Sequence, residues 1–409
     1  MNEIDYKVIY IPTTNNLTSV HAYVKTGNVC ETSKNSGIAH LLEHVIADSW
    51  DKCAGNCKTF WSKRGIFSNA QTTTLYTRYF ITGLTKEIEN IIDYMASIMT
   101  NPRFDAKTIN SAKLAVMDEL LIRTNNPGWR LYDNFFKSFN DNLTNGFGRS
   151  YDYPLKIKNL ETITPKDLSD YYHKWYRPNN TFFIVVSNEP LSKINLLFSN
   201  YLFRRPIMTF LPTSYSLNCN RHVSVVYRKD AEKSTFIIGF INNKQHPKDF
   251  MYYEIIKDML TGDMSSLLYR ILRDDLNLIY GIKLDYDMNS SFIVSMFEVN
   301  CQIKNSQKLI TALVSSLKKF VSGRFDGKLL SRSKERLTIL DMTRSKENTE
   351  MISDFYANQF IMSGKYDVTQ DAYMKFVSGI SKDKLLGVAK RLFQFNKMVI
   401  SCETKGVPI

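Results

Sequence analysis

The sequence contains 409 residues, of which 44% are hydrophobic and 23% are charged. This length predicts two or three domains at about 100–200 residues each, and the apolar content excludes a wholly disordered chain. The 53 lysines and arginines against 40 aspartates and glutamates give a net charge of +13. Because these cations are scattered, with no arginine-rich arm, zinc-finger spacing or aromatic RNA-binding motif, we expect no nucleic-acid partner.

The sequence shows no sign of a membrane or of an export signal. No apolar run approaches the roughly 20 residues of a membrane-spanning helix, and the N-terminal residues read as a strand rather than as a signal or transit peptide. We therefore expect a cytoplasmic protein with no membrane partner. Six cysteines occur at irregular spacing, and Cys53 and Cys57 have no second pair to complete a zinc site. We predict that all six are free thiols in a reducing compartment.

The first half of the chain mixes strands with helices. In chain order we predict strands at 7–11 and 20–25, a helix at 37–47, a strand at 68–83, helices at 86–99, 106–124 and 166–175, and a strand at 182–186. The apolar residues of the 86–99 helix recur with the 3.6-residue period of one helix face. Thr164 and Pro165 predict the start of the helix at 166, since threonine caps helix N-termini and proline suits the first turn.

The second half repeats this coarse order. In chain order we predict strands at 223–227 and 236–241, helices at 250–260 and 265–275, strands at 279–285 and 292–303, helices at 308–321, 329–344, 352–362 and 382–393, and a strand at 398–402. Prolines and the lack of a clear period place an interdomain linker at 206–220. We predict an α+β fold with two similar domains, at 1–205 and 221–409.

The most informative motif is the segment 37–44, which reads GIAHLLEH. His40 and His44 are four residues apart on a predicted helix, so both imidazoles lie on one face and can reach one zinc ion. Glu43 is nearly on that face, where it can act on a metal-activated water without binding the metal. The motif is the inverse of the H-E-x-x-H zinc peptidase motif. The alternative is a polar helix face with two surface histidines.

With this motif, the sequence resembles the pitrilysin-like, or inverzincin, family of zinc metallopeptidases. Three further segments carry the resemblance, namely 24–40 before and into the motif, 65–72 (GIFSNAQT), and 260–281 (LTGDMSSLLYRILR followed by LIYG). The resemblance covers essentially the whole chain. Its length matches single-length subunits similar to the β-type subunit of mitochondrial processing peptidase.

The resemblance also implies the remaining site residues. The third zinc ligand of the family is a carboxylate about 75 residues downstream, which corresponds to Glu119. The neighbouring Asp118 points about 100° away around the helix. Asn69 and Ala70 would bind the substrate main chain along a sheet edge, and Arg273 and Tyr280 would contact the substrate near the zinc. One departure is Ala112, where the family commonly has a glutamate, and this puts the catalytic rate in doubt.

The resemblance therefore implies a zinc endopeptidase that binds one Zn²⁺ per chain and uses Glu43 as general base. Each of the two domains would be a mainly antiparallel sheet flanked by helices, and together they would form half of a clam-shell peptidase chamber. We expect a peptide or unfolded protein as substrate, and a homodimer or a heterodimer with a related subunit. The alternative is a catalytically silent scaffold or partner subunit of the same fold.

Overall fold

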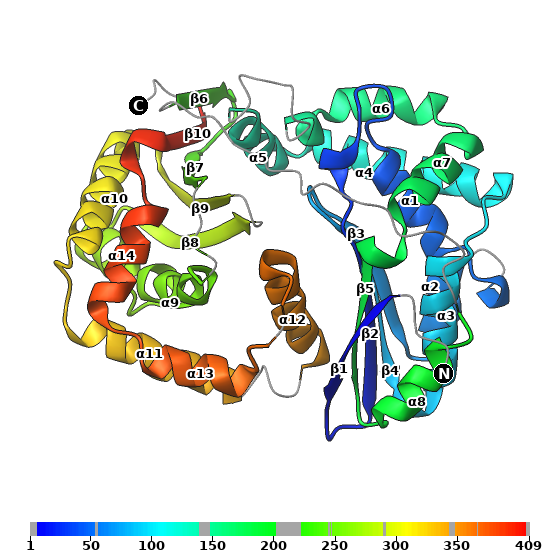
Figure 1. The fold of residues 1–409 in the computed structure, drawn as a ribbon. Coiled ribbons are helices and arrows are strands. Elements are labelled where there is room, and N and C mark those ends of the chain that lie inside the picture. The colour runs from blue at the N-terminus through cyan, green and yellow to red at the C-terminus, as the bar shows by residue number, and fades with distance from the viewer. Residues whose placement is uncertain are drawn as a thin grey trace. The chain divides into compact units, whose positions relative to one another are not determined.

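The computed structural model describes residues 6–53, 56–138, 148–201, 222–243, 246, 248–288, 292–342, 348–365 and 367–405. These residues form two compact units (Figure 1). Unit 1 takes the described residues of Met1–Asn125, Leu143–Thr213 and Ser345–Asn358, and unit 2 those of Asn126–Asn142, Ser214–Arg344 and Gln359–Ile409. None of the helices within the described ranges is long and apolar enough to cross a membrane.

Unit 1 contains a five-stranded sheet in the order β1-β5-β2-β4-β3. Its strands are β1 (Lys7–Pro12), β2 (Leu17–Val24), β3 (Phe67–Thr72), β4 (Thr77–Leu84) and β5 (Thr181–Ser187). Strands β1 and β5 run parallel, and the other neighbours are antiparallel.

The single strand predicted at 68–83 was wrong, because β3 and β4 are two antiparallel strands joined by a tight turn. The Thr73 hydroxyl accepts hydrogen bonds from the backbone N–H groups of Leu75 (3.2 Å) and Tyr76 (3.0 Å). These side-chain hydrogen bonds stabilise the turn, which contains none of the glycine, proline or asparagine residues that usually mark one. The segment therefore contains no residue type that predicts a break between the two strands.

Besides α12 (Thr349–Ser363), seven α-helices among the described residues of unit 1 pack on this sheet or on one another. They are α1 (Ile38–Ala47), α2 (Cys57–Ser62), α3 (Ile88–Thr100), α4 (Ala106–Asn125), α6 (Tyr153–Thr162), α7 (Pro165–Trp175) and α8 (Leu191–Phe198). The apolar face predicted for α3 is buried throughout, at Ile88, Ile91, Ile92, Met95 and Met99. The predicted cap of α7 is also confirmed, since Thr164 and Asp167 form a capping box.

The other face of this sheet is covered by residues 349–358 of α12, which come from the second half of the chain (Figure 1). Asp354 of this helix accepts hydrogen bonds from the Tyr23 hydroxyl (3.0 Å) and the Arg78 guanidinium (2.6 Å). Ile352 and Tyr356 of the same helix are buried. Residues 349–358 of α12 therefore belong to the core of unit 1.

Unit 2 has a second five-stranded sheet with the equivalent order, β6-β10-β7-β9-β8. Its strands are β6 (His222–Tyr227), β7 (Lys233–Asn242), β8 (Ile279–Met288), β9 (Ile293–Gln302) and β10 (Met398–Thr404). Only β6 and β10, among the paired strands that the structure describes here, run parallel. Matching strand orders confirm the prediction of two similar, mainly antiparallel α+β domains.

The helices of unit 2 are α5 (Pro127–Lys137), α9 (Phe250–Thr261), α10 (Ser306–Val321), α11 (Lys328–Leu340), α13 (Gln370–Ser378) and α14 (Lys382–Leu392). In place of the helix predicted at 265–275, a turn is followed by two helical residues at 267–268 and by a π-helix over Tyr269–Asp275. Short 3₁₀ helices occur at Asn28–Cys30, Asp51–Cys53, Thr85–Glu87, Gly148–Tyr151, Pro178–Asn180, Ile303–Asn305 and Phe395–Lys397.

Helix α5 packs on the sheet of unit 2, although it directly follows α4 of unit 1 in the chain. A Cβ atom at Gly239 of β7 would overlap the Phe135 ring of α5, so glycine is needed for this approach. The Ser401 hydroxyl of β10 donates to the Leu131 carbonyl of α5 (3.2 Å). The predicted domains, 1–205 and 221–409, would put α5 in the first domain and residues 349–358 in the second. In the structure, α5 belongs to unit 2 and residues 349–358 belong to unit 1. The predicted linker at 206–220 lies outside the described residues.

Candidate metal centre

Helix α1 is fixed at its N-terminus by a buried carboxylate. Glu31, which is only 3% exposed, accepts hydrogen bonds from the backbone N–H groups of Gly37 (2.9 Å) and Ala39 (3.0 Å), and from the Ser36 hydroxyl (3.3 Å). Burial raises the pKa of Glu31 despite these bonds. A carboxylate suits this place because the first N–H groups of a helix have no partner within the helix. Sequence analysis assigned no role to Glu31, although it lies in a segment that carries the family resemblance.

The structure brings His40, His44 and Glu119 together. Glu119 comes from α4, and its carboxylate lies 3.2 Å from His40 Nε2 and 3.7 Å from His44 Nε2. The three candidate ligand atoms lie within 4.8 Å of one another, the only such His, Cys, Asp or Glu group found in the described part of the chain. Two ligands of a tetrahedral zinc, each bonded at about 2.0–2.1 Å, lie about 3.3 Å apart. The three side chains therefore fit one zinc ion.

The contacts between the two imidazoles and Glu119 shift the pKa values of this cluster. Hydrogen bonds from His40 and His44 hold the pKa of Glu119 well below its usual range. Burial alone would lower the pKa of His44, but its hydrogen bond with Glu119 and the nearby charge of Glu43 raise it overall. Asp118 is exposed and is not part of the group. Of the two neighbouring carboxylates, the structure thus places Glu119 beside the histidines.

Glu43 lies beside this cluster without joining it. Its side chain is 6% exposed and accepts a hydrogen bond from the Thr72 hydroxyl (2.8 Å), at the end of β3. A cavity of about 320 Å³ is lined by Glu43, by the three clustered residues and by residues 68–72 of β3. Thr72 was missed as a functional candidate, although it is the last residue of the GIFSNAQT segment.

The predicted sheet edge is confirmed for residues 67–72. Strand β3 is the last strand of its sheet, and Asn69 and Ala70 line the same cavity. The Asn69 side-chain oxygen accepts a hydrogen bond from the Ala70 N–H (3.0 Å). Ala112, at the departure from the family pattern, is a buried residue of α4.

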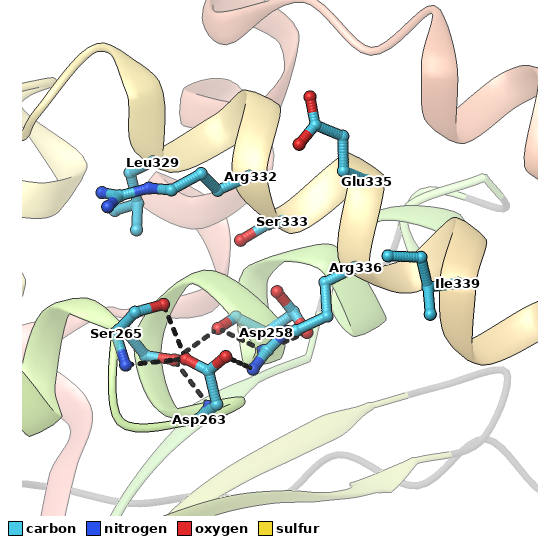
Figure 2. A pocket seen from close by; sticks show the side chains of 10 residues that line it. Asp258, Asp263, Ser265, Leu329, Arg332, Ser333, Glu335, Arg336 and Ile339 are labelled. Carbon is cyan, nitrogen blue, oxygen red and sulfur yellow. Dashed lines mark hydrogen bonds and ion pairs between the residues drawn. The ribbon is translucent and has the colours of Figure 1, made fainter.

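Arg273 and Tyr280 belong to unit 2. The Arg273 guanidinium lies 5.3 Å from the centre of the Tyr280 ring, and Tyr280 is 82% exposed. Arg273 lies on the π-helix, and the turn before this helix lines a second cavity of about 280 Å³ (Figure 2). The proximity of Arg273 and Tyr280 to each other is shown, and their role near the metal stays a prediction.

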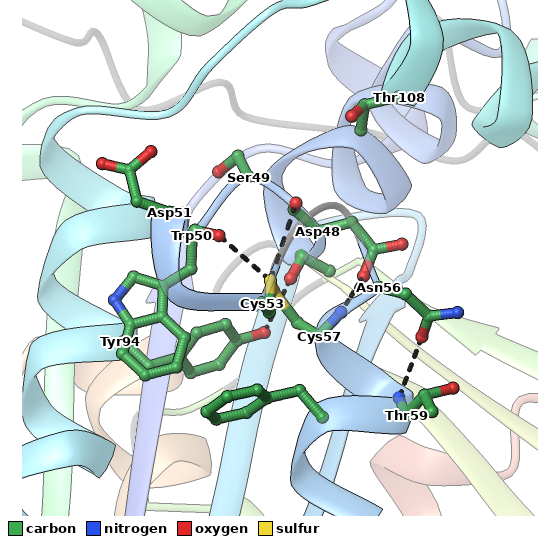
Figure 3. The surroundings of a disulfide bond; sticks show 12 residues. Asp48, Ser49, Trp50, Asp51, Cys53, Asn56, Cys57, Thr59, Tyr94 and Thr108 are labelled. Atoms are coloured by element: carbon green, nitrogen blue, oxygen red, sulfur yellow. Dashed lines mark hydrogen bonds between the residues drawn. A yellow bond between two sulfur atoms is a disulfide. The ribbon is translucent and has the colours of Figure 1, made fainter.

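A disulfide joins Cys53 and Cys57 near the end of α1, the helix that carries His40 and His44 (Figure 3). Cys53 ends a 3₁₀ helix and Cys57 begins α2, which brings their Cα atoms to 4.8 Å, within disulfide range. Asp48, which follows α1, accepts a hydrogen bond from the Cys57 N–H (2.8 Å). The prediction of six free thiols was wrong for this pair, because the spacing of two cysteines in the sequence does not show how close their Cα atoms lie. Free cysteines are Cys30, Cys301 and Cys402, while Cys219 lies outside the described residues.

Comparison with known proteins supports the family resemblance. Residues 7–137 match "Insulinase (Peptidase family M16)" and residues 162–337 match "Peptidase M16 inactive domain". A protein named an uncharacterized zinc protease in Rickettsia felis is 23% identical over 387 residues, covering 92% of this chain and 89% of that protein. The β subunit of the mitochondrial processing peptidase of Saccharomyces cerevisiae is 28% identical over 172 residues, covering 41% and 36%.

The fold has solved counterparts as well. A protease from Helicobacter pylori superposes with a TM-score of 0.84 at 21% identity, covering 98% of this chain and 97% of that one. The two family matches fall on the two halves of the chain, and the zinc proteases that resemble it span nearly its whole length. The chain therefore belongs to the M16 family of peptidases.

Proposed function

We propose that this chain is a zinc-dependent endopeptidase that cleaves peptides or extended segments of unfolded proteins. The observation that carries the proposal is the convergence of His40, His44 and Glu119 from two helices, with Glu43 in the same cavity. Two imidazoles and one carboxylate are a ligand set of catalytic zinc sites, which leave a fourth position open. The similar zinc protease of Rickettsia felis supports this proposal.

The residues would divide the chemistry as follows. His40, His44 and Glu119 would hold one Zn²⁺ per chain, and a bound zinc supplies a Lewis acid for the scissile carbonyl and lowers the pKa of water. Glu43 would take a proton from the attacking water and deliver it to the leaving amine. The Thr72 hydroxyl would hold the Glu43 carboxylate in place for both transfers.

The substrate would bind along β3. An extended peptide can pair with a sheet edge through main-chain hydrogen bonds, which tolerate many sequences. Asn69 and Ala70 lie on this edge and in the cavity, so both are placed to contact the peptide main chain. By resemblance, Tyr280 would donate a hydrogen bond to the oxyanion and Arg273 would hold the substrate.

Members of this family occur as paired subunits, and one similar protein is named as a subunit. We propose a homodimer, or a heterodimer with a related subunit, in which Arg273 and Tyr280 complete the partner's site. A cytoplasmic location also stays a prediction. The disulfide of Cys53 and Cys57 speaks against the reducing compartment that was inferred from the cysteine spacing.

A catalytically silent scaffold is the second candidate, and Ala112 favours it because the family commonly has a glutamate there. The match to an inactive M16 domain does not add to this argument. It covers residues 162–337, which include none of the proposed zinc ligands and not Glu43.

The test is hydrolysis of a quenched peptide library by the purified, zinc-loaded chain, alone and with a related subunit. We expect cleavage by the wild-type chain and a loss of at least about a hundredfold for Glu43→Gln, since a positioned base contributes about 10²–10⁴-fold. Zinc content after dialysis should be the same for both. Absence of hydrolysis under every condition, or equal hydrolysis by Glu43→Gln, would reject the assignment.

A further inference from the structure

We propose that Arg336 is a positioning residue for Arg273. It fixes the turn at 262–266, which leads through the helical residues 267–268 into the π-helix that carries Arg273. This inference rests on the proposed substrate contact of Arg273, and it adds a residue that neither the motifs nor the metal centre involves.

Arg336 connects α11 to the end of α9 through two aspartates (Figure 2). Its guanidinium forms an ion pair with Asp258, which is only 6% exposed, and donates to the Asp258 carbonyl (3.3 Å). It also forms an ion pair with Asp263 (2.5 Å), whose side chain is 43% exposed. A single side chain thus holds both the last turn of α9 and the first residues of the following loop.

Gly262, between these two aspartates, is explained by the same contact. Its backbone has an ordinary right-handed helical conformation, so no special dihedral requires glycine here. A Cβ atom at this position would overlap the Arg336 guanidinium. The glycine of the GDMSS segment is therefore needed for Arg336 to reach both aspartates.

The loop passes this constraint on to the π-helix. Asp263 accepts hydrogen bonds from the N–H (2.8 Å) and the hydroxyl (2.8 Å) of Ser265. The Ser266 hydroxyl donates to the Asp258 carbonyl (3.0 Å), and the Ser266 carbonyl accepts the N–H of Arg270 (3.1 Å). A continuous series of bonded groups therefore leads from Arg336 into the turn of helix before Arg273.

The π-helix at Tyr269–Asp275 depends on how the loop at 262–266 is held. Such helices are rare, and their backbone bonds are less favourable than those of an α-helix, so they persist where the surroundings hold them and are frequent at functional sites. The direction of the Arg273 side chain depends on this unusual winding, and its guanidinium lies over Tyr280. We infer that releasing the loop at 262–266 lets both side chains move.

The chain offers a matched control in unit 2. Arg391 pairs with Asp249 through two hydrogen bonds (2.9 and 2.6 Å), and Asp249 is also 6% exposed. This pair joins α14 to the start of α9, at the other end of that helix from Arg336. Arg336→Met and Arg391→Met therefore each remove one arginine from a buried aspartate, and only the first frees the loop.

The experiment compares these two variants in the full-length, zinc-loaded chain by amide hydrogen exchange and by kcat/KM on a quenched peptide. We expect exchange over 263–277 to become about tenfold faster in Arg336→Met and to stay unchanged in Arg391→Met. We expect kcat/KM to fall by about tenfold to a hundredfold in Arg336→Met alone, since small misplacements of a contact residue have such effects. Zinc content should not change.

A double mutant tests the route through Arg273. If Arg336 acts through Arg273, then Arg336→Met should cost no more than about twofold in an Arg273→Ala background. Equal losses in Arg336→Met and Arg391→Met, or full additivity with Arg273→Ala, would overturn the proposal.

Asp263→Asn is the second variant if Arg336→Met fails to fold. It removes the charge that faces Arg336 and keeps an amide oxygen for Ser265. Wild-type exchange over 263–277 together with wild-type kcat/KM in this variant would also overturn the proposal. If the wild-type chain cleaves no peptide, the proposed function fails separately, and the exchange measurement still decides whether Arg336 holds the loop.

Discussion

The hydrogen bond from Thr72 to Glu43 should contribute measurably to the proposed peptidase activity. Thr72→Val keeps the side-chain shape and removes the hydroxyl that donates to the Glu43 carboxylate at 2.8 Å. A hydrogen bond to a charged group contributes about 1.5–3 kcal/mol, and Glu43 is a buried residue, at 6% exposed. If this energy acts fully in the transition state, kcat/KM falls by about 10- to 150-fold.

The assay is hydrolysis of a quenched peptide, with zinc content measured on the same samples. Thr72→Ser, which keeps the hydroxyl, should retain most of the activity. Thr82→Val is the matched control, because its hydroxyl bonds to Ser19 (2.7 Å) on the neighbouring strands and does not line the cavity. A kcat/KM for Thr72→Val within twofold of the wild type would refute the role of this bond, and equal losses in Thr72→Val and Thr82→Val would show a general effect on the sheet.

Three further predictions test the ligands, the pairing of subunits and the buried histidine. Glu119→Gln should lose most of its zinc on dialysis, because a neutral amide is a weaker ligand; undiminished zinc would exclude Glu119 and make Asp118 the next candidate. Mixing Glu43→Gln with Tyr280→Phe subunits, each inactive alone, should restore about half of the wild-type activity per mixed dimer if sites are completed by the partner. No recovery after verified subunit exchange would indicate sites completed within one chain or by a different subunit. Burial lowers the pKa of His21 from 6.5 to about 3, so below pH 6.5 the unfolded chain binds a proton that the folded chain does not, and stability falls as the pH falls by about 1.4 kcal/mol per unit. Between pH 6.5 and 5, the free energy of unfolding measured in urea should therefore fall by about 2 kcal/mol less in His21→Gln than in the wild type. An equal fall in both proteins would contradict this assignment.

The candidate metal centre could be predicted largely because its parts are local or periodic. The spacing of His40, Glu43 and His44 fixes their directions on one helix, whatever the rest of the fold. Glu119 is different, since nothing local links it to α1, and only the family resemblance pointed to it. Once α4 was known to be a helix, the 100° step between neighbours separated Glu119 from Asp118.

Contacts between side chains distant in the sequence could not be predicted in the same way. Thr72 bonds to Glu43 only because β3 ends beside α1, and this needs the sheet order. The disulfide depends on a 3₁₀ helix that ends at Cys53, and four residues of spacing are equally compatible with an extended loop. Glu31 is charged but buried because it accepts hydrogen bonds from N–H groups at the start of α1 that have no partner within the helix. The pattern of apolar residues around Glu31 does not predict this.

The exchange of helices between the two units shows the limit of sequence patterns most clearly. The period of apolar residues shows that one face of a helix is buried, but the two sheets have equivalent strand orders and so offer similar surfaces. For α5, the choice depends on Phe135 and on Gly239, which lacks the side chain that would exclude that ring. A cut in the predicted linker would leave α5 on the fragment that does not contain its sheet, so Phe135 would lose its packing surface and β7 its cover. The two units are therefore each built from both halves of the sequence, and neither is encoded by a continuous stretch of it.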